Sequence, residues 1–599
     1  MSDFLLDLRP PESRSLERVA GAFRFAPDTK SVVIDRPEFG LVVSQTGNPA
    51  IWAPYCAESG SLAAFAGRPV FDESDWLAAR LDSGAGGWAA KIATRRLDEE
   101  GEPSLERLNG NFALVALDGT RHILYLVTDC CGVFPSFHAD TAEGPVYGSH
   151  PDVVAQEAGE NRRFDDISLA EFILSGTVTP PNTFYERVRA LDSATVLRFD
   201  LRNARIAPPS RRRYFTFEYR GDNGTTEQEL ANNLAGALIG AVRRRTNPLL
   251  GPVAVALSGG LDSRIVLGCS ANPDHTIAFN CFDRPNRELR AAGTIAKSLA
   301  TRFLPVQRDE DYYGVHAECG VRISGGMGSL ANNHFLGAIP RLKAEGIETM
   351  LTGCYCDYLF KALPLNKRSH WLTRRESLGS FRHQFYFDHF GADTVLAARA
   401  RERMGARVPA DLQKRNDPAA VFQIEALRTF PLCYEGDNQQ RLVPQRTMGW
   451  CPPFVDRDVI DVYCRLPYTL KFNRSMFRKT VTAISPRLGE ITDANTGASP
   501  GSSAAWEWVR STQLRLGRAA KRLTGVPVNE ESWPEWKVYL EHSHTLADQW
   551  KRPNPIAADL YHRVLGRWSD NDFETAKRQQ PFLFLGLLTV KLWLDQRAA

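Results

Sequence analysis

The sequence predicts a two-part protein that combines α+β and α/β architecture. Up to residue 213, short runs of hydrophobic residues are separated by turn signals, which is typical of strands packed in sheets with a few helices. From residue 214 to 599, strand-like runs alternate with helix-like stretches, which predicts a parallel sheet covered by helices. From about Ala426 onward the pattern is mostly helical. The 599 residues are enough for two or more domains.

Composition narrows the class of protein. Hydrophobic residues make up 43% of the chain and charged residues 24%, as in ordinary globular proteins. The net charge of only +3 gives no global field that would attract nucleic acid. No run of about 18 apolar residues is present, so we expect no membrane span. The N-terminal stretch MSDFLLDLRPPESRS lacks the pattern of a secretory signal, so we expect a cytoplasmic protein.

The eleven cysteines do not form a recognisable framework. Their number is odd and they are scattered over a long chain, which argues against structural disulfides. The pairs Cys130–Cys131 and Cys354–Cys356 also lack the two-residue gap of zinc ribbons. We therefore expect buried, reduced thiols.

Several local patterns predict individual elements. SVVIDRPEFGLVVSQTG predicts a hairpin that turns at Pro37–Gly40, and NGNFALVALDGTRHILYLVTD predicts two strands joined at Asp118–Gly119. The basic stretch LRNARIAPPSRRRYF, with its Pro-Pro pair, is interpreted as a linker. TEQELANNLAGALIGAVRRRT has helical spacing and a capping-box start. PVAVAL, HTIAFNCF and ETMLTG are predicted strands.

The stretch VAVALSGGLDSRIVLG carries the clearest chemical signal. An apolar strand is followed by Ser258, Gly259, Gly260, Leu261, Asp262 and Ser263, and then by a predicted helix. Backbone N–H groups of a glycine turn at a helix start bind phosphate, and the two serine hydroxyls can donate further hydrogen bonds. A carboxylate beside phosphate is repulsive unless a cation lies between them, so Asp262 indicates Mg²⁺. The Gly-Lys-Ser/Thr ending of a Walker loop is absent.

This motif resembles the Ser-Gly-Gly-x-Asp-Ser pyrophosphate loop of ATP pyrophosphatases, enzymes that cleave ATP between the α and β phosphates and adenylate a substrate oxygen. LTGCYCDYLF is similar to the Gly-Glu-Gly-x-Asp-Glu-Leu-Phe element of asparagine synthetases. The resemblance implies that Asp357 helps Asp262 to hold Mg²⁺. Cys354 stands where that family has glutamate.

The resemblance to the asparagine synthetase family extends over most of the chain, including LERLNGNFALVALDGTRHILYLVTDCCGVFPSFHA and DNQQRLVPQRTMGWCPPFVDRDVIDVYCRLPYTLKF. It implies an N-terminal Ntn-hydrolase-like, glutaminase-like sandwich over residues 1–213. It also implies an adenine nucleotide alpha-hydrolase-like synthetase domain over residues 214–599, with ATP as the nucleotide.

Three departures from the family pattern bear on function. Position 2 is Ser2, where glutamine-dependent members expose a cysteine, and the Asn-Gly-Glu-Ile-Tyr-Asn stretch has no counterpart between Ile51 and Asp75. A serine hydroxyl is far less ionised than a thiol, so we expect an inactive glutaminase domain. Asn495 stands where β-lactam synthetase has a catalytic lysine, and a neutral amide cannot supply that charge.

These departures resemble lasso peptide cyclases, the macrolactam synthetases of lasso peptide biosynthesis. The implied reaction adenylates an Asp or Glu side chain of a linear core peptide and closes an amide with its N-terminal amine. Tyr355 and Glu435 are candidates for assisting the amine, and Lys361 or Lys367 for supplying the missing cation. The implied partners are a leader peptidase and a leader-binding protein.

Two alternatives stay open: a ligase that acts on a small acid, like asparagine synthetase or β-lactam synthetase, and a non-catalytic nucleotide-binding protein.

Overall fold

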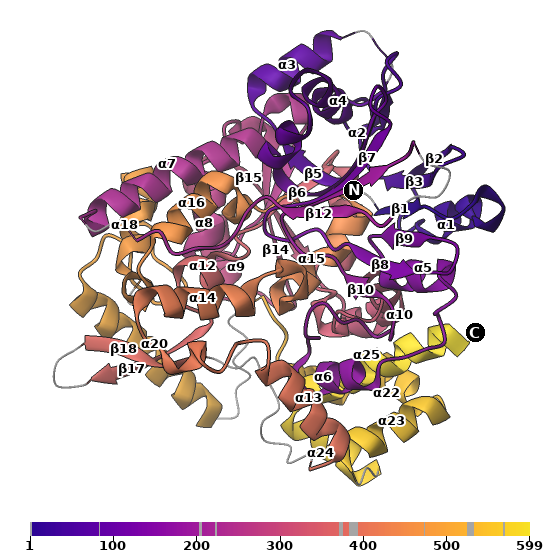
Figure 1. Cartoon of the computed structure of the whole chain (residues 1–599). Coiled ribbons are helices and arrows are strands. Elements are labelled where there is room, and N and C mark those ends of the chain that lie inside the picture. Colours follow the sequence, from indigo (N-terminus) through magenta and orange to yellow (C-terminus); the bar gives the residue numbers. More distant parts are fainter. Residues whose placement is uncertain are drawn as a thin grey trace.

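The computed structural model describes residues 3–82, 84, 86–202, 207–221, 224–370, 375–381, 393–472, 474–523, 532–566 and 570–598. Two six-stranded antiparallel sheets form the first part (Figure 1). One sheet has the order β10-β8-β9-β1-β3-β2 and the other β12-β11-β7-β6-β5-β4. Their strands are β1 (Asp3–Asp7), β2 (Lys30–Asp35), β3 (Gly40–Gln45), β4 (Tyr55–Cys56), β5 (Leu62–Val70), β6 (Asn109–Asp118), β7 (Ile123–Thr128), β8 (Phe137–Asp140), β9 (Pro145–Gly148), β10 (Arg189–Ala190), β11 (Thr195–Asp200) and β12 (Ser210–Arg213).

The two sheets pack face to face, with helices on their outer faces. One hydrophobic cluster joins Phe4 and Leu6 of β1 to Val115 of β6 and Leu126 of β7. The outer faces are covered by α1 (Leu16–Ala22), α2 (Pro49–Trp52), α3 (Glu73–Leu81), α4 (Trp88–Glu100), α5 (Pro151–Glu157) and α6 (Asp166–Ser175). This layering confirms the predicted glutaminase-like sandwich fold.

Both predicted hairpins are present. In the first, β2 and β3 pair antiparallel up to Asp35 and Gly40. In the second, β6 and β7 pair up to Asp118 and Ile123. The linker prediction is wrong for residues 210–213, which form β12 at the edge of the second sheet. All four β12 residues are exposed and three are arginines, which suits an edge strand because charge there discourages further pairing.

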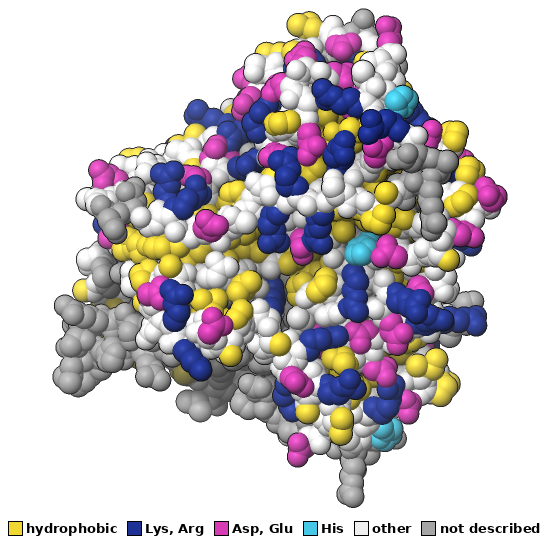
Figure 2. Space-filling view, viewed as in Figure 1, with side chains coloured by type: hydrophobic (Ala, Val, Ile, Leu, Met, Phe, Trp, Pro, Cys, Tyr) yellow, Lys and Arg dark blue, Asp and Glu magenta, His cyan; other side chains and the backbone are white. Residues whose placement is uncertain are grey.

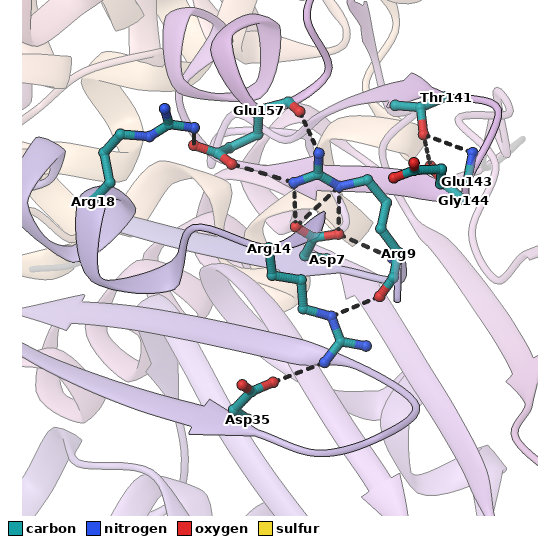
Figure 3. A network of polar contacts seen from close by, with 9 residues as sticks. All are labelled: Asp7, Arg9, Arg14, Arg18, Asp35, Thr141, Glu143, Gly144 and Glu157. Carbon is teal, nitrogen blue, oxygen red and sulfur yellow. Dashed lines mark hydrogen bonds and ion pairs between the residues drawn. The ribbon is translucent and has the colours of Figure 1, made fainter. Parts of the chain in front are cut away.

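A network of charged groups holds the far end of β1 (Figure 3). The Arg9 guanidinium donates hydrogen bonds to both Asp7 carboxylate oxygens and to the Glu157 carboxylate. Glu157 also accepts from Arg18, and Arg14 links the Arg9 carbonyl to β2. This network borders a cavity of about 1380 Å³ between the two sheets. All three guanidinium nitrogens of buried Arg9 donate hydrogen bonds, to two carboxylates and to the Glu157 carbonyl, so we interpret the network as structural.

The second part is built on a four-stranded parallel sheet of order β15-β14-β13-β16. Its strands are β13 (Val253–Ala256), β14 (Thr276–Phe282), β15 (Arg302–Gln307) and β16 (Thr349–Leu351). The sequence predicts all but β15. Alternate residues enter two hydrophobic clusters, with Val253 and Val255 on one face of the sheet and Ala254 on the other. Helices cover both faces, as the α/β prediction requires.

The helices on this sheet are α7 (Glu227–Arg245), α8 (Leu261–Gly268), α9 (Arg287–Ser298), α10 (Tyr312–Ser324), α11 (Ile339–Ala344) and α12 (Cys356–Phe360). The predicted capping box is present, with reciprocal bonds between Thr226 and Glu229. An antiparallel hairpin that the sequence does not predict follows, formed by β17 (Leu365–His370) and β18 (Arg375–Phe381).

The remaining chain is helical, as predicted. It contains α13 (Val395–Gly405), α14 (Pro418–Thr429), α15 (Gly436–Thr447), α16 (Arg457–Arg465), α17 (Tyr468–Phe472), α18 (Ser475–Ile484), α19 (Pro486–Glu490), α20 (Ala504–Leu523), α21 (Trp536–His542), α22 (His544–Lys551), α23 (Pro555–Leu565), α24 (Asp570–Gln579) and α25 (Pro581–Ala598). The last helix returns to the first part and packs on α6 (Figure 1). One core cluster therefore spans both parts, and the division at residue 213 stays a prediction.

The surface and the cysteines match the sequence expectations. On the face in Figure 2, Lys and Arg side chains are scattered among Asp and Glu. All eleven cysteines are free, and most are buried. Within the described ranges, the chain has no helix with the length and apolar character needed to cross a bilayer.

A buried ion pair between α14 and α17 gives a test of the helical packing. The Lys471 ammonium lies 2.8 Å from both carboxylate oxygens of Glu425, and both side chains are fully buried. Lys471→Met leaves the carboxylate buried without a partner, so we expect a loss of about 3–5 kcal/mol of stability. Thermal unfolding followed by circular dichroism measures the loss. The double variant Glu425→Leu/Lys471→Met removes both charges and should recover most of it. Equal losses in the single and double variants would contradict this account.

Candidate nucleotide and metal site

The glycine loop lies at the carboxyl end of β13, where parallel sheets bind ligands. Ser258 and Ser263 close the loop: their hydroxyl oxygens are 2.9 Å apart, and the Ser258 N–H donates to the Ser263 hydroxyl over the same distance. The Gly260 N–H donates to the Ser258 hydroxyl at 3.3 Å. Gly260 is the N-cap of α8, and among the described residues no side chain caps that helix. The N–H groups of the first turn are therefore suited to an anionic ligand.

The second loop, after β16, touches the first so closely that only glycine fits. A Cβ at Gly353 would lie 2.6 Å from the Asp262 Cβ and 2.8 Å from the Ser263 nitrogen. Gly353 is thus required by packing. Gly259 is similarly constrained, because its Cβ would lie 2.4 Å from the Cβ of Ala494. Gly259 is therefore favoured for two reasons: it lets the backbone approach a phosphate, as the sequence predicts, and it leaves room for the third loop at Ala494.

The contact brings Asp262 and Asp357 together around one lysine. The Lys361 ammonium forms an ion pair with Asp262 and lies 3.0 Å from an Asp357 carboxylate oxygen. Asp357 and Lys361 are one helical turn apart at α12, a spacing that favours such a pair. Asp262 and Lys361 are mostly covered, whereas Asp357 is half exposed.

The charges of these three groups depend on one another. Burial opposes the charge on Lys361, but Asp262 and Asp357 outweigh burial and hold the Lys361 pKa above its usual value. Burial raises the pKa of Asp262, and the attraction of Lys361 offsets only part of that rise. Burial also acts on Asp357, yet Lys361 lowers its pKa.

The two carboxylates fit a magnesium ion. They already share one cation, the Lys361 ammonium, so the pair attracts positive charge to the edge of the glycine loop. Mg²⁺ usually takes one or two protein carboxylates and completes its shell with water and phosphate oxygens. Among the described residues, no group of three or more His, Cys, Asp or Glu could hold a metal alone. This donor set suits an ion that arrives with a phosphate ligand.

A cavity of about 330 Å³ lies over these loops. Ser258, Asp262, Ser263, Asp357 and Tyr355 line it. Tyr355 is buried and adopts a left-handed conformation with φ of 72°, which is unusual for a residue with a side chain and marks a sharp turn after β16. The structure therefore brings the predicted loop, the two carboxylates and Tyr355 together.

Glu435 lies elsewhere. It is buried at the start of α15 and does not line the cavity. The segment that precedes it packs on the first part, where Leu432 and Cys433 donate backbone hydrogen bonds to the carbonyls of Cys131 and Gly132. The structure thus places Glu435 beside the junction between the two parts. Its predicted role stays a prediction.

The third loop carries Asn495, the residue at the predicted lysine position. The Ala494 N–H donates to the Gly259 carbonyl at 3.0 Å. Arg264, buried on α8, donates to the carbonyls of Ile491 and Thr492 at 2.6 and 2.9 Å. Its burial lowers the Arg264 pKa to about 10. These bonds hold the Asn495 loop against the glycine loop. The side chain of Lys367 lies outside the described residues.

The far end of the cavity uses residues that the sequence interpretation did not single out. They are Phe279, Asn280, Cys281, Glu288, His334, Phe335, Ser532 and Trp533. The end of β14 was a foreseeable source, because ligands bind at the carboxyl ends of parallel strands. Ser532 and Trp533 gave no signal, because they lie more than 250 residues from the strand they approach.

Known protein families match both parts of the chain. The glutamine amidotransferase domain family matches residues 91–214, and the asparagine synthase family matches residues 233–509. Asparagine synthetase [glutamine-hydrolyzing] 3 of Bacillus subtilis (strain 168) is 26% identical over 171 residues. That alignment covers 28% of this chain and 27% of the relative, so it spans about a quarter of the relative's length.

Two solved structures share a more distant similarity. One is described as the allosteric regulatory enzyme of purine biosynthesis, with 8% identity and a TM-score of 0.26 over 51% of this chain and 80% of that one. The other is glutamine phosphoribosylpyrophosphate amidotransferase from B. subtilis complexed with ADP and GMP, with 9% identity and a TM-score of 0.24 over 51% and 65%. TM-scores this low do not establish a shared fold.

The fold and the site define a class of protein, in which a glutaminase-like sandwich precedes a parallel-sheet synthetase domain with a pyrophosphate loop. The two family matches follow one another along the chain, and the second includes both the glycine loop and Asp357. Residues 91–214 thus match the glutamine amidotransferase domain family, and residues 233–509 match the asparagine synthase family.

The contact at Gly353 yields a prediction about the site. In Gly353→Ala, the new methyl group collides with Asp262 and displaces the glycine loop, so we expect MgATP to bind at least about tenfold more weakly, since 1.4 kcal/mol corresponds to tenfold. Isothermal titration calorimetry measures the binding. Gly236→Ala is the matched control, because that glycine lies in α7 with nothing within 4 Å of the added atom. Unchanged binding in Gly353→Ala would show that the two loops tolerate separation.

Proposed function

We propose that the protein is an ATP-dependent, AMP-forming amide ligase. In this reaction a substrate carboxylate oxygen attacks the α-phosphorus of ATP, and the bond between the α-phosphorus and the bridging oxygen breaks to release pyrophosphate. An amine then attacks the acyl carbon, AMP leaves, and the amine proton passes to a base or to solvent. The observation that carries the proposal is the cavity in which the glycine loop, Asp262 and Asp357 meet, with Lys361 paired to both carboxylates behind its lining.

Each group has a role that its position supports. Backbone N–H groups and hydroxyls of the Ser258–Ser263 loop bind the pyrophosphate oxygens. Lys361 is fixed by two carboxylates, so its charge is already oriented before the substrate arrives. Asp262 and Asp357 would hold Mg²⁺, which when bound neutralises charge on the phosphates. Tyr355 lines the same cavity and is the candidate to orient the amine.

We further propose that the substrate is a linear peptide whose Asp or Glu side chain is joined to its own N-terminal amine. Asn495 stands at the predicted lysine position, and the family's glutamine-holding stretch has no counterpart between Ile51 and Asp75. Both departures support a peptide substrate over asparagine synthesis. The B. subtilis relative, an asparagine synthetase by name, supports the alternative of a small acid and ammonia. The peptidase and leader-binding partners stay predictions.

The packing between the two parts supports an amine that does not come from the first part as ammonia. No described residue of the first part lines the cavity. At the opposite edge of the sheet, Arg68 is buried against the Trp52 ring at 4.1 Å, and burial lowers its pKa to about 10. The adjoining space is about 20 Å³, room for about one water molecule.

The first test measures pyrophosphate release with MgATP and three additions: a leaderless core peptide, aspartate with ammonia, or nothing. We expect release that depends on the peptide and a product lighter than the peptide by one water. Asp262→Asn should abolish release, whereas Asp274→Asn, an exposed carboxylate outside the cavity, should not. Release with aspartate and ammonia alone would favour the small-acid reaction. ATP binding without release under any condition would favour a binding protein.

Lys361 gives a second test. Lys361→Met removes the charge that faces the two carboxylates, so we expect pyrophosphate formation to slow by about 10²–10³-fold, the usual cost of losing one preorganised electrostatic group. Quenched-flow measurement of a single turnover reports this step. Lys297→Met on exposed α9 surface is the control. A rate within twofold of the unmodified protein would remove Lys361 from the reaction.

A further inference from the structure

The cavity of about 1380 Å³ in the first part lies at the end of β1 that the Arg9 network holds (Figure 3). None of its described lining residues also lines the cavity over the glycine loop. Residue 2, where glutamine-dependent members of the asparagine synthetase family expose a cysteine, precedes the opposite end of β1. The cavity is therefore separate from both of these sites. Its volume exceeds the roughly 300–1,000 Å³ of pockets for small molecules, which suits a peptide segment.

Core side chains form one wall of this cavity. Leu8, Leu191, Leu197 and Leu201 line it together with Tyr147, and all five belong to the hydrophobic cluster between the two sheets. An opening onto such a cluster can take up an apolar side chain of a ligand, because that side chain gains free energy by leaving water.

Tyr147 places a hydroxyl without a protein partner at this wall. The residue is only 3% exposed, and its ring stacks on His138 with the centroids 5.8 Å apart. The hydroxyl makes no hydrogen bond with any described residue, yet it is not sealed from the cavity that Tyr147 lines. Burial raises the Tyr147 pKa, so the hydroxyl keeps its proton and can donate as well as accept. A covered hydroxyl without a partner costs free energy unless a ligand supplies one.

The mouth of the cavity carries unbalanced negative charge. Glu12, Glu38, Asp140 and Glu143 are exposed lining residues, and none of them pairs with a lysine or arginine in the described part of the chain. Burial lowers the His138 pKa, so this ring adds no positive charge at neutral pH. Each arginine in the lining already pairs with a carboxylate outside it: Arg9 with Asp7, Arg202 with Asp200, and Arg211 with Asp192. The four unpaired carboxylates therefore favour a cationic ligand.

The rim of the cavity is held in place before any ligand arrives. In the turn that carries Glu143, the Thr141 hydroxyl donates to the Gly144 carbonyl at 2.8 Å and accepts from the Glu143 N–H at 3.2 Å (Figure 3). A Cβ at Gly144 would lie 2.7 Å from the Leu8 carbonyl oxygen, so the turn rests directly on the end of β1. Six of the described lining residues are prolines, which restrict the backbone: Pro10, Pro11, Pro37, Pro145, Pro208 and Pro209. A preformed rim lowers the entropy cost of binding.

We propose that this cavity binds a basic peptide segment, whose Lys or Arg side chains pair with the four carboxylates while an apolar side chain packs among the leucines. The Tyr147 hydroxyl donates to a carbonyl oxygen of the bound peptide. A peptide carries all three kinds of group on one chain, whereas a metal ion or a simple diamine lacks the apolar one. The inference goes beyond the proposed function and does not depend on it, because the two cavities share no described lining residue.

The test titrates the full chain with three peptides by isothermal titration calorimetry. The probes, acetylated and amidated at their ends, are Leu-Lys-Leu-Lys-Leu, Leu-Glu-Leu-Glu-Leu and Gly-Lys-Gly-Lys-Gly. We expect the first to bind most tightly, and more weakly at high NaCl concentration, because salt screens exposed charges. Equal affinity for the two leucine peptides, or for the two lysine peptides, would overturn the inference, as would a failure of the first peptide to bind.

Variants assign the binding to this cavity. Asp140→Asn/Glu143→Gln should raise the Kd of Leu-Lys-Leu-Lys-Leu by about 2- to 30-fold, the usual range for two exposed ion pairs. Tyr147→Phe keeps the ring and should raise it by about 2- to 13-fold through the lost hydrogen bond. Asp274→Asn/Glu310→Gln, at exposed carboxylates outside the cavity, is the matched control and should leave Kd unchanged. An unchanged Kd in both cavity variants would place the peptide elsewhere and contradict the proposal.

A second measurement uses the unmodified protein and does not depend on any variant folding. Benzoylphenylalanine replaces the central leucine of Leu-Lys-Leu-Lys-Leu, and mass spectrometry maps the photo-cross-links. We expect them within residues 137–147 or 191–201, and cross-links confined to other segments would overturn the inference. MgATP should bind Asp140→Asn/Glu143→Gln as it binds the unmodified protein, so a failure of peptide binding is distinguishable from a failure of the proposed function.

Discussion

The candidate site depends on a backbone contact that a single methyl group would prevent. β13 and β16 are neighbours in a parallel sheet, so the loops that follow them emerge at the same edge. Parallel strands bring such loops near one another, but only a residue without Cβ lets Gly353 approach Asp262 at the observed distance. The pairing of Asp262 with Asp357 and Lys361 follows from that approach. Close packing at Gly353 is therefore what allows these charged groups to meet at this edge of the sheet.

Charge sets the second constraint. The ionisable acids that line the cavity are Asp262, Glu288 and Asp357, and none of the described lining residues is lysine or arginine. ATP is itself highly anionic, so such a cavity repels it unless cations intervene. Lys361, behind the lining, offsets one negative charge. In the proposed reaction, nucleotide and divalent cation would therefore enter together or in close succession, which fits two carboxylates that cannot enclose a metal alone.

The sequence was most informative where a property is local. The glycine loop, the capping box at Thr226 and the paired strands of the first part are set by residues close along the chain. Asp357 and Lys361 could be linked because they lie one turn apart on a helix. The edge strand β12 was mistaken for a linker because its four residues are polar and follow a Pro-Pro pair. β15 was missed because hydrophobic and polar residues alternate only partly along its sequence, Arg302–Gln307. In the structure, buried and exposed side chains do alternate along most of this strand.

Long-range contacts explain what the sequence could not reveal. Glu435 follows a segment that is hydrogen-bonded to Cys131 and Gly132. Its position is therefore set by packing on the first part and not by the residues next to it in the sequence. The far end of the cavity depends on Ser532, which reaches a strand more than 250 residues earlier. Polar residues in a region without a periodic signal carry no trace of such a contact.

The first part can be essential without glutaminase chemistry. Trp536, next to the segment that bears Trp533, packs on Tyr313 at 4.7 Å, and α21 and α24 rest on α25. From α25, Trp593 inserts among Phe164 and Phe184 of the first part and donates to the Asp152 carboxylate at 3.1 Å. The sandwich thus supports the helices that pack next to the Trp533 segment at the far end of the cavity. The predicted loss of the glutaminase reaction is therefore compatible with retention of the sandwich fold, because α25 packs on it.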